Sequence, residues 1–279
     1  MLSYRNKRLI RKFTRKRIII YGSVLAVLVV LSLFAPYFAP YDPIQISMEG
    51  RKSPNVDHIF GTDRLGRDIL SRIIYGTKYS LSIGIMSVSI GLIFGTTMGV
   101  LSAYYGGLVD TIIMRFIDAL LAFPGILLAL VVIAVLGPGL FNVMLAVGIS
   151  TVPEYARLAR GKVLSVMQLE YIEAIHSIGG SNIRVILKHI LPNISAPITI
   201  LATLQVGNAI LVGSGLSFLG MGAQPPTPEW GLMTAEGRNF MSQAWWISTF
   251  PGIAILITVI SINQFGDGLR EAIDPYFKE

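Results

Sequence analysis

A moderately polar stretch at residues 171–193 separates two long apolar runs and carries residue types suited to contact with another protein. Glu173 offers a carboxylate for a basic partner, an interaction that strengthens where solvent is excluded. Gly179-Gly180 permits the positive φ of a sharp turn between two helices. Apolar contact area can come from Ile172, Ile175 and Ile178. The stretch predicts a helix pair that fits a groove of a soluble partner, and a solvated amphipathic connector is the alternative.

The chain shows no residue set for catalysis or for holding a cofactor of its own. Arg160-Gly161-Lys162-Val163 lacks the upstream glycine and the hydroxyl residue of a nucleotide phosphate loop. The three histidines, His58, His176 and His189, show no metal-ligand spacing, and no cysteine is present. We therefore expect no catalytic residue, no metal and no cofactor bound by this chain. A membrane enzyme is disfavoured for the same reason.

The composition indicates an integral membrane protein. Of 279 residues, 53% are hydrophobic and 14% are charged, whereas soluble domains carry about 25% charged residues. The net charge of +7 does not require a nucleic-acid partner, because eight of the 23 Lys and Arg residues precede residue 18. Such a cluster before an apolar run is a topology signal and is attracted to anionic lipid on the cytoplasmic side.

Six apolar runs approach the roughly 20 residues that a membrane-spanning helix needs. We expect spans at Ile18–Phe38, Tyr79–Val109, from after Asp118 to the Gly137-Pro138-Gly139 turn, Leu140–Ala156, Ile194–Gly220 and Trp246–Phe265. We favour a first span over a cleaved signal peptide, since more spans follow. Six spans and a basic amino terminus place both ends in the cytoplasm. The Lys and Arg excess in 154–192 agrees with this orientation, and the loop 41–78 agrees less well.

The expected organisation is a basic cytoplasmic tail (1–17), a first transmembrane helix with an external segment (18–78), and the main membrane domain (79–279). Glycines at a spacing of four predict a close helix contact: Gly91, Gly95 and Gly99. Arg115 and Asp118 are interpreted as an interfacial pair near a membrane entry. The three tryptophans are interpreted as an interfacial belt, with a role in an outer gate as the alternative: Trp230, Trp245 and Trp246.

Polar residues in the fifth run need partners inside the membrane. Asn208, Gln205 and Thr203 are candidates to line a translocation path, or they bond to neighbouring helices. No acid is expected in the middle of a span. This disfavours an ion-coupled secondary transporter or channel, which is the rival class of function.

Several segments together resemble one family, the second (C-type) permease subunit of the peptide and nickel ABC importers. They are Gly61–Arg72, Pro153–Gly161, Leu216–Gly222 with Pro225–Gly231, Gly266–Pro275, and Glu173-Ala174, Gly179 and Leu191-Pro192 at the spacing of the EAA loop. Ile175 departs from the second alanine common in this loop.

The resemblance implies an all-α polytopic protein with the type I ABC importer permease fold. It implies ATPase coupling through Glu173, Ala174, Gly179, Leu191 and Pro192. It also implies a second related permease, two ATPase subunits that hold ATP and Mg²⁺, an extracytoplasmic binding protein, and a bacterial or archaeal cell membrane. The cargo is expected to be a peptide, with nickel or another metal–chelator complex as the alternative.

Overall fold

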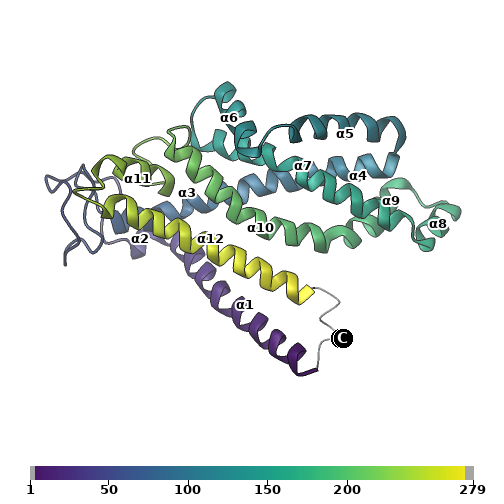
Figure 1. Cartoon of the computed structure of the whole chain (residues 1–279), viewed down its shortest axis with the longest axis horizontal. Helices are drawn as coiled ribbons and strands as arrows, with labels where there is room; N and C mark the ends of the chain where they lie inside the picture. The colour runs from purple at the N-terminus through teal and green to yellow at the C-terminus, as the bar shows by residue number, and fades with distance from the viewer. Residues whose placement is uncertain (1–3, 274–279) are drawn as a thin grey trace.

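The protein is an elongated bundle of helices with two different ends (Figure 1). The computed structural model describes residues 4–273, apart from the side chains of residues 4–15, 176 and 273. Predictions on the basic side chains before Lys16 and on Asp274-Pro275 therefore lie outside the described residues. Regular structure in the described part is helical except for one isolated bridge between Thr62 and Asp68. The all-α expectation is confirmed.

The helices follow one another with short connections, except at residues 39–68. Their bounds are α1 Tyr4–Leu33, α2 Ala35–Phe38, α3 Ile69–Ile90, η1 Gly91–Gly95, α4 Thr96–Tyr105, α5 Gly107–Leu121, α6 Gly125–Leu136, α7 Leu140–Met167, α8 Glu170–Ser177, α9 Asn182–Val185, η2 Ile186–Ile190, α10 Leu191–Phe218, α11 Trp230–Gly237, η3 Arg238–Phe240 and α12 Trp246–Ile273. η1 and η2 are π-helical segments inside longer helices. The units α3–η1–α4 and α9–η2–α10 are therefore continuous helices of 37 residues each.

The six expected spans correspond to six helical units. Four described helices are long and apolar enough to cross a membrane, and the pair α5–α6 makes a fifth candidate with a 94° bend. The helix α7 has the length of a span at 28 residues, although charges from Glu154 onward lower its apolar character. The described part of the chain is thus consistent with a multi-pass membrane protein.

Two span boundaries differ from the sequence-based expectation. The second span begins at Ile69 rather than Tyr79, because the Asp68 side chain caps α3 by accepting the N–H of Ser71 at 2.8 Å. The boundary placed at residue 79 therefore falls inside a helix. The expected boundary came from a run without charged residues, which excludes Arg72 and Lys78. Arg72 nevertheless lies in the helix, where it is buried and paired with acids.

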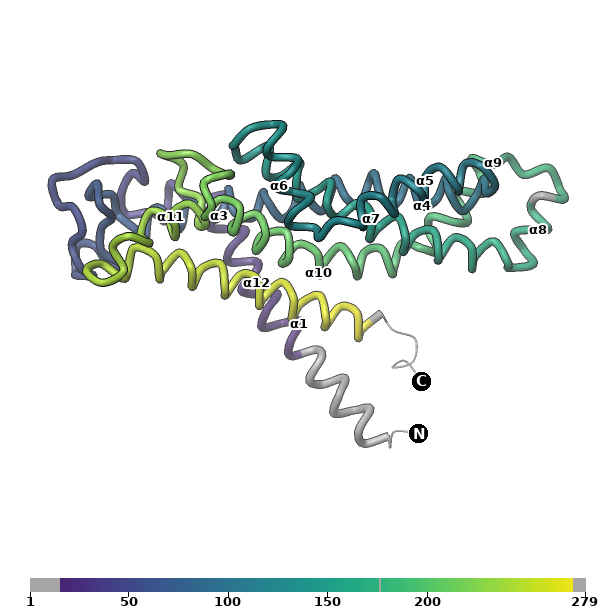
Figure 2. The backbone as a smooth tube through the Cα atoms, turned by 45° about the horizontal axis from the view of Figure 1, so that its top comes forward, coloured from purple at the N-terminus to yellow at the C-terminus, as the bar shows by residue number. Residues whose placement is uncertain are grey.

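The third span is broken rather than straight. α5 begins at Gly107, well before Arg115, and α6 leaves it after Pro124. The expected pair of Arg115 and Asp118 is wrong as a pair, because Asp118 accepts a hydrogen bond from Arg157 of α7 at 2.7 Å. In Figure 2, α6 stands off the bundle while α5 runs along it.

The two ends of the bundle are named here by the short helices that mark them. The α8 end is formed by residues 170–190, and α8 projects beyond the other helices (Figures 1 and 2). The α11 end is formed by residues 39–68, α11 and the start of α12. At the start of α12, the rings of Phe60 and Phe250 stack at 4.2 Å between centroids. Near its other end, Arg17 of α1 forms an ion pair with Glu271 at 3.7 Å.

The centre of the bundle is a close contact between α7 and the glycines of η1 and α4. A Cβ on Gly95 would lie 2.5 Å from the carbonyl oxygen of Val152 and 2.6 Å from Tyr155 Cβ. Gly91 and Gly99 approach Thr151 and the carbonyl of Ala156 in the same way. The predicted packing face is confirmed, and its partner is a helix of the same chain. Small residues allow the two backbones to approach closely, because no side chain lies between them. The close approach strengthens dispersion and weak backbone contacts.

The tryptophans at the α11 end are protein core rather than a lipid-facing belt, except Trp245. Trp230 and Trp246 are 0% and 7% exposed, while Trp245 is 49% exposed. Their indole N–H groups donate to the carbonyls of Ile73 and Thr62 at 3.0 and 3.2 Å. A buried indole needs such a partner, and both partners flank the start of α3.

A buried ion network joins residues 63–72 to α11. Asp63 accepts hydrogen bonds from Arg67 Nε at 2.6 Å and from Arg72 Nη1. Glu236 of α11 accepts from Arg67 at 3.0 Å and from Arg72 at 3.1 Å. The two cations balance the two acids, and both arginines are almost fully buried. The network is neutral as a whole, so the loss of any one member leaves an uncompensated charge.

The glycine contact generates the first prediction. Gly95→Leu should lower the amount of folded protein recovered in detergent, because overpacking alone costs about 1–3 kcal/mol and here the obstruction is backbone. Fluorescence-detected size exclusion measures the recovery. Gly252→Leu is the control, since a Cβ there meets nothing within 4 Å. Equal recovery of the two variants would contradict the proposed importance of the contact.

The ion network generates the second prediction. Asp63→Asn should lower the free energy of unfolding by about 3–5 kcal/mol, because it leaves two buried arginines with one acid. The apparent melting temperature in detergent measures this loss. Asp57→Asn, at an exposed position of the same segment, should leave the melting temperature unchanged within error. A parallel drop in both variants would show that the network is not the cause.

Candidate coupling, pathway and outer sites

The α8 end carries the predicted docking residues on a helix–turn–helix. The turn is a Schellman arrangement, in which the N–H of Gly180 donates to the carbonyl of Ile175 at 2.9 Å. Gly179 has φ +83°, a conformation that a residue with a Cβ adopts only with strain. This fits the expectation that the glycine pair reverses the chain.

The free face of the helix pair differs in part from the predicted one. Glu173 and Ala174 are exposed, as docking requires. The expectation that Ile172 supplies contact area is wrong, because this side chain is 2% exposed and packs in the chain's own core. Ile175 is half-buried against the same core. Ile178 is 84% exposed and is available to a partner.

Two further apolar residues at this end were not singled out from the sequence. Ile183 of α9 and Leu187 of η2 are exposed, as is Ile178, and the three are named here the open apolar group. Their i, i+4 spacing places Ile183 and Leu187 on one side of the helix, which is a signal the sequence contains. Exposed apolar groups of this kind mark contact sites. Leu191 and Pro192 follow at the start of α10.

The helix pair is attached firmly to the bundle. Val185 and Ile190 are fully buried in the main core. The amide of Asn193 donates to the hydroxyl of Tyr171 at 3.0 Å, which ties the start of α10 to α8. The pair is therefore joined both to the core and to α10, whose helix continues without interruption from Asn182 to Phe218.

Two of the three pathway candidates meet halfway along α10. Asn208 donates to Gln205 Oε1 at 3.2 Å, and Gln205 Nε2 donates to Glu154 of α7. Gln205 is 7% exposed, whereas Asn208 and Glu154 are exposed in the single chain. Thr203 is not part of this group. Its Oγ1 would lie 3.0 Å from a Cβ on Gly266, so it faces α12.

Glu154 is an acid at the midpoint of a long helix, where the sequence-based expectation placed the end of a span. The sequence reading ended the fourth span at Ala156, but α7 continues to Met167 and has Glu154 at its midpoint. Arg157 and Arg160 do not neutralise it, since they pair with Asp118 and Asp110 of α5 at 2.7 Å. Insertion of an acid at the centre of a spanning helix costs about 2.5–3.5 kcal/mol.

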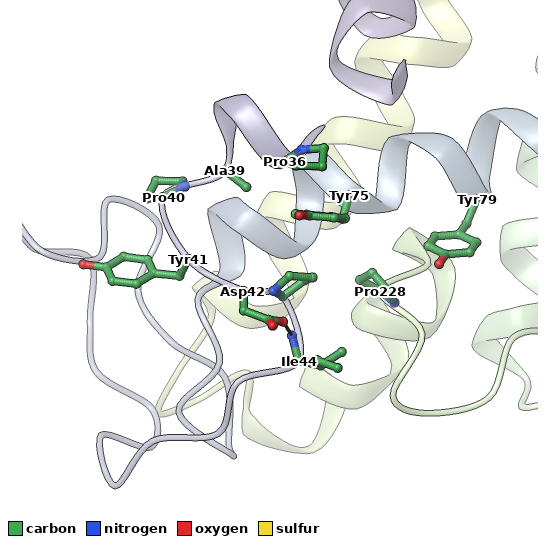
Figure 3. A pocket seen from close by; sticks show the side chains of 10 residues that line it. Pro36, Ala39, Pro40, Tyr41, Asp42, Ile44, Tyr75, Tyr79 and Pro228 are labelled. Atoms are coloured by element: carbon green, nitrogen blue, oxygen red, sulfur yellow. Dashed lines mark hydrogen bonds between the residues drawn. The ribbon is translucent and has the colours of Figure 1, made fainter. Parts of the chain in front are cut away.

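The α11 end contains a pocket of about 560 Å³ (Figure 3). It lies between α2, the start of α3 and the loop before α11, and its lining is Pro36, Ala39, Pro40, Tyr41, Asp42, Pro43, Ile44, Tyr75, Tyr79 and Pro228. The Asp42 carboxylate is used within its own loop, where it accepts the N–H of Ile44 at 2.9 Å. Prolines make this wall stiff, because their φ is fixed.

Next to this pocket, Glu229 attaches α11 to two long helices. Its carboxylate accepts the N–H groups of Gly231 and Leu232 at 2.8 Å, which caps α11. Ser80 of α3 and Ser214 of α10 also donate to it, at 3.4 Å. Burial raises the pKa of Glu229 above its ordinary value, and the backbone N–H groups oppose that rise. The cap of α11 is thus bonded to the same helix that continues from the α8 end.

Comparison with solved structures supports the importer permease fold. The chain is similar to a chain of the inward-facing MetNI methionine ABC transporter, with a TM-score of 0.60, 17% identity, and coverage of 74% of this chain and 98% of that one. A chain of an amino acid ABC transporter crystallised with histidines gives a TM-score of 0.57 at 12% identity, with coverage of 73% and 95%. At these identities the likeness concerns the fold alone.

Comparison of sequences identifies the family. The model of the binding-protein-dependent transport system inner membrane component matches residues 91–279, and that of the N-terminal TM domain of oligopeptide transport permease C matches residues 6–54. The chain is 44% identical over 271 residues to the glutathione transport system permease protein GsiD of Pectobacterium atrosepticum, with 96% and 90% coverage. It is 43% identical over 270 residues to the dipeptide transport system permease protein DppC of Alkalihalophilus pseudofirmus, with 96% and 89% coverage. The chain therefore belongs to the inner membrane components of binding-protein-dependent transport systems, within the permeases of the peptide ABC importers.

Proposed function

We propose that this chain forms half of the membrane path of an ATP-driven importer for short peptides. The observation that carries the proposal is the helix pair at the α8 end, which joins an exposed docking surface to a continuous helix that reaches the polar group at mid-bundle. The relatives named for glutathione and dipeptide transport support a cargo of two or three residues. The other half of the path comes from a second, related permease.

ATP is bound by two separate ATPase subunits at the α8 end, which lies in the cytoplasm. Glu173 and the open apolar group of Ile178, Ile183 and Leu187 support this docking, because they combine one acid with exposed apolar area. Ala174, Gly179, Leu191 and Pro192 shape the helix pair that the ATPase contacts. Closure of the ATPases moves the pair, and α10 transmits that movement.

An extracytoplasmic binding protein delivers the peptide at the α11 end. The stiff pocket wall and the cap around Glu229 support this role, since α11 is bonded to both α3 and α10. A loaded binding protein that favours one arrangement of these helices shifts the transporter towards its outward-open state. The two ligands, ATP and loaded binding protein, act on opposite ends of α10.

Orientation gives the third prediction. The natural chain has no cysteine, so single cysteines can be introduced without background. Ser181→Cys, in the exposed α8–α9 turn, should react with a membrane-impermeant maleimide only after the cells are opened. Val56→Cys, at a position 96% exposed at the α11 end, should react in intact cells. Labelling of Ser181→Cys from outside would exclude ATPase docking at this end.

Coupling gives the fourth prediction. Glu173→Lys should abolish uptake and the stimulation of ATPase activity by loaded binding protein, because it places a cation opposite a basic partner. Loss of a charged hydrogen-bond partner alone costs about 1–3 kcal/mol. Gly179→Val should act similarly, since a β-branched residue resists φ +83° and redirects α9. Uptake and ATPase activity are measured in reconstituted vesicles at equal permease levels.

The controls for this experiment separate coupling from general damage. Glu173→Asp keeps the carboxylate charge, and Gly137→Val introduces the same backbone strain at φ +84° in open space between α6 and α7, outside the two ends. Both should retain stimulated ATPase activity. Normal stimulated uptake in Glu173→Lys and Gly179→Val would refute the proposed transmission through the helix pair.

A further inference from the structure

The mid-helix polar group, defined as Glu154, Gln205 and Asn208, has a fixed direction of hydrogen bonding. Asn208 donates to Gln205, and Gln205 donates to Glu154. Glu154 Oε1 and Asn208 Oδ1 have no hydrogen-bond partner among the residues that the structure describes. The exposed part of the group therefore offers two open acceptors and one negative charge. Such a surface is complementary to an ammonium group, which has donors only.

The group lies halfway along two long helices. Glu154 and Gln205 are each at the midpoint of a 28-residue helix, α7 and α10 respectively. Acids in spanning helices face the bundle interior or a water-filled path rather than lipid. Glu154 and Asn208 are exposed in the single chain, and the basic residues nearest along α7 are paired with α5.

We propose that the mid-helix polar group is the pathway site that receives the amino-terminal ammonium group of the transported peptide. This inference rests on the proposed function, because the cation that every free peptide carries is its amino-terminal ammonium. Glu154 supplies the charge, Asn208 supplies a second acceptor, and the buried Gln205 is a positioning residue that orients both. A charge-assisted hydrogen bond is about twice as strong as a neutral one.

The two helices give the site a way to change with the transport cycle. Glu154 is on α7, which the close contact with Gly95 holds against α4. Gln205 and Asn208 are on α10, which continues from the α8–α9 pair. A movement of α10 relative to α7 separates Asn208 from Glu154 and weakens the hold on the ammonium group. The site thus binds in one state and releases in the other.

The test uses the whole transporter in vesicles, with saturating binding protein and two probes. Ala-Ala carries the ammonium group, and lactoyl-alanine has a hydroxyl group in its place. Glu154→Gln should reduce the maximal uptake rate of Ala-Ala about tenfold, as expected when a charge-assisted hydrogen bond becomes neutral. Uptake of lactoyl-alanine should change by less than about twofold. Glu154→Asp, which keeps the charge, should retain most Ala-Ala uptake.

Each other result overturns the inference in a recognisable way. An equal loss for both probes in Glu154→Gln would assign Glu154 a structural role. Reduced copurification of the second permease with Glu154→Gln would assign it to the permease–permease interface. If the wild-type transporter moves neither probe while it hydrolyses ATP, the peptide function itself fails, and this inference fails with it.

Discussion

The close contact between α7 and the glycines of η1 and α4 is the constraint on which the rest of the bundle depends. Backbone meets backbone at Gly95 and Val152, so neither helix can shift without opening a gap or a clash. With α7 fixed in this way, its paired arginines hold α5, its midpoint presents Glu154 to α10, and its end leads into α8. Two of the sites described above therefore take their positions from one contact between small residues.

The helix α10 complements this fixed element because it links the two ends of the molecule. It continues from the α8–α9 pair, is bonded to Glu154 at its midpoint, and is bonded to Glu229 near the α11 end. Its core face is mainly apolar, but Gln205 and Ser214 donate hydrogen bonds to acids of neighbouring segments. A helix with this distribution of contacts can respond to events at both ends of the protein.

The sequence predicted the helical class, the spans and the reversal at Gly179 well, because apolar length and glycine conformation are local properties. It failed where a distant residue decided the outcome. Arg72 was excluded from a span because it is charged. In the folded protein, Asp63 and Glu236 neutralise that charge, and the sequence alone does not show these contacts. Trp230 was assigned to an interfacial belt, because its hydrogen-bond partner, the carbonyl of Ile73, is far away in the chain.

The same limit explains the errors at the candidate sites. Glu154 was placed at the end of a span, because the charges that follow it end the apolar run, and its amide partner is on another helix. Ile172 was assigned to an interface, while Ile183 and Leu187 were not considered. Helical spacing shows which residues share a face, but it does not show which face the core occupies.

The buried ion network has a consequence for the order in which the protein is built. Arg67 and Glu236 are separated by 169 residues, so at synthesis rates of 5–20 residues per second roughly 10–30 s pass before Glu236 emerges. During that interval the two arginines share the single carboxylate of Asp63. Until α11 is in place, these two arginines therefore lack one of the two acids that they contact in the folded protein. The cap at the α11 end is among the last parts of the molecule to be completed, although its first residues are made early.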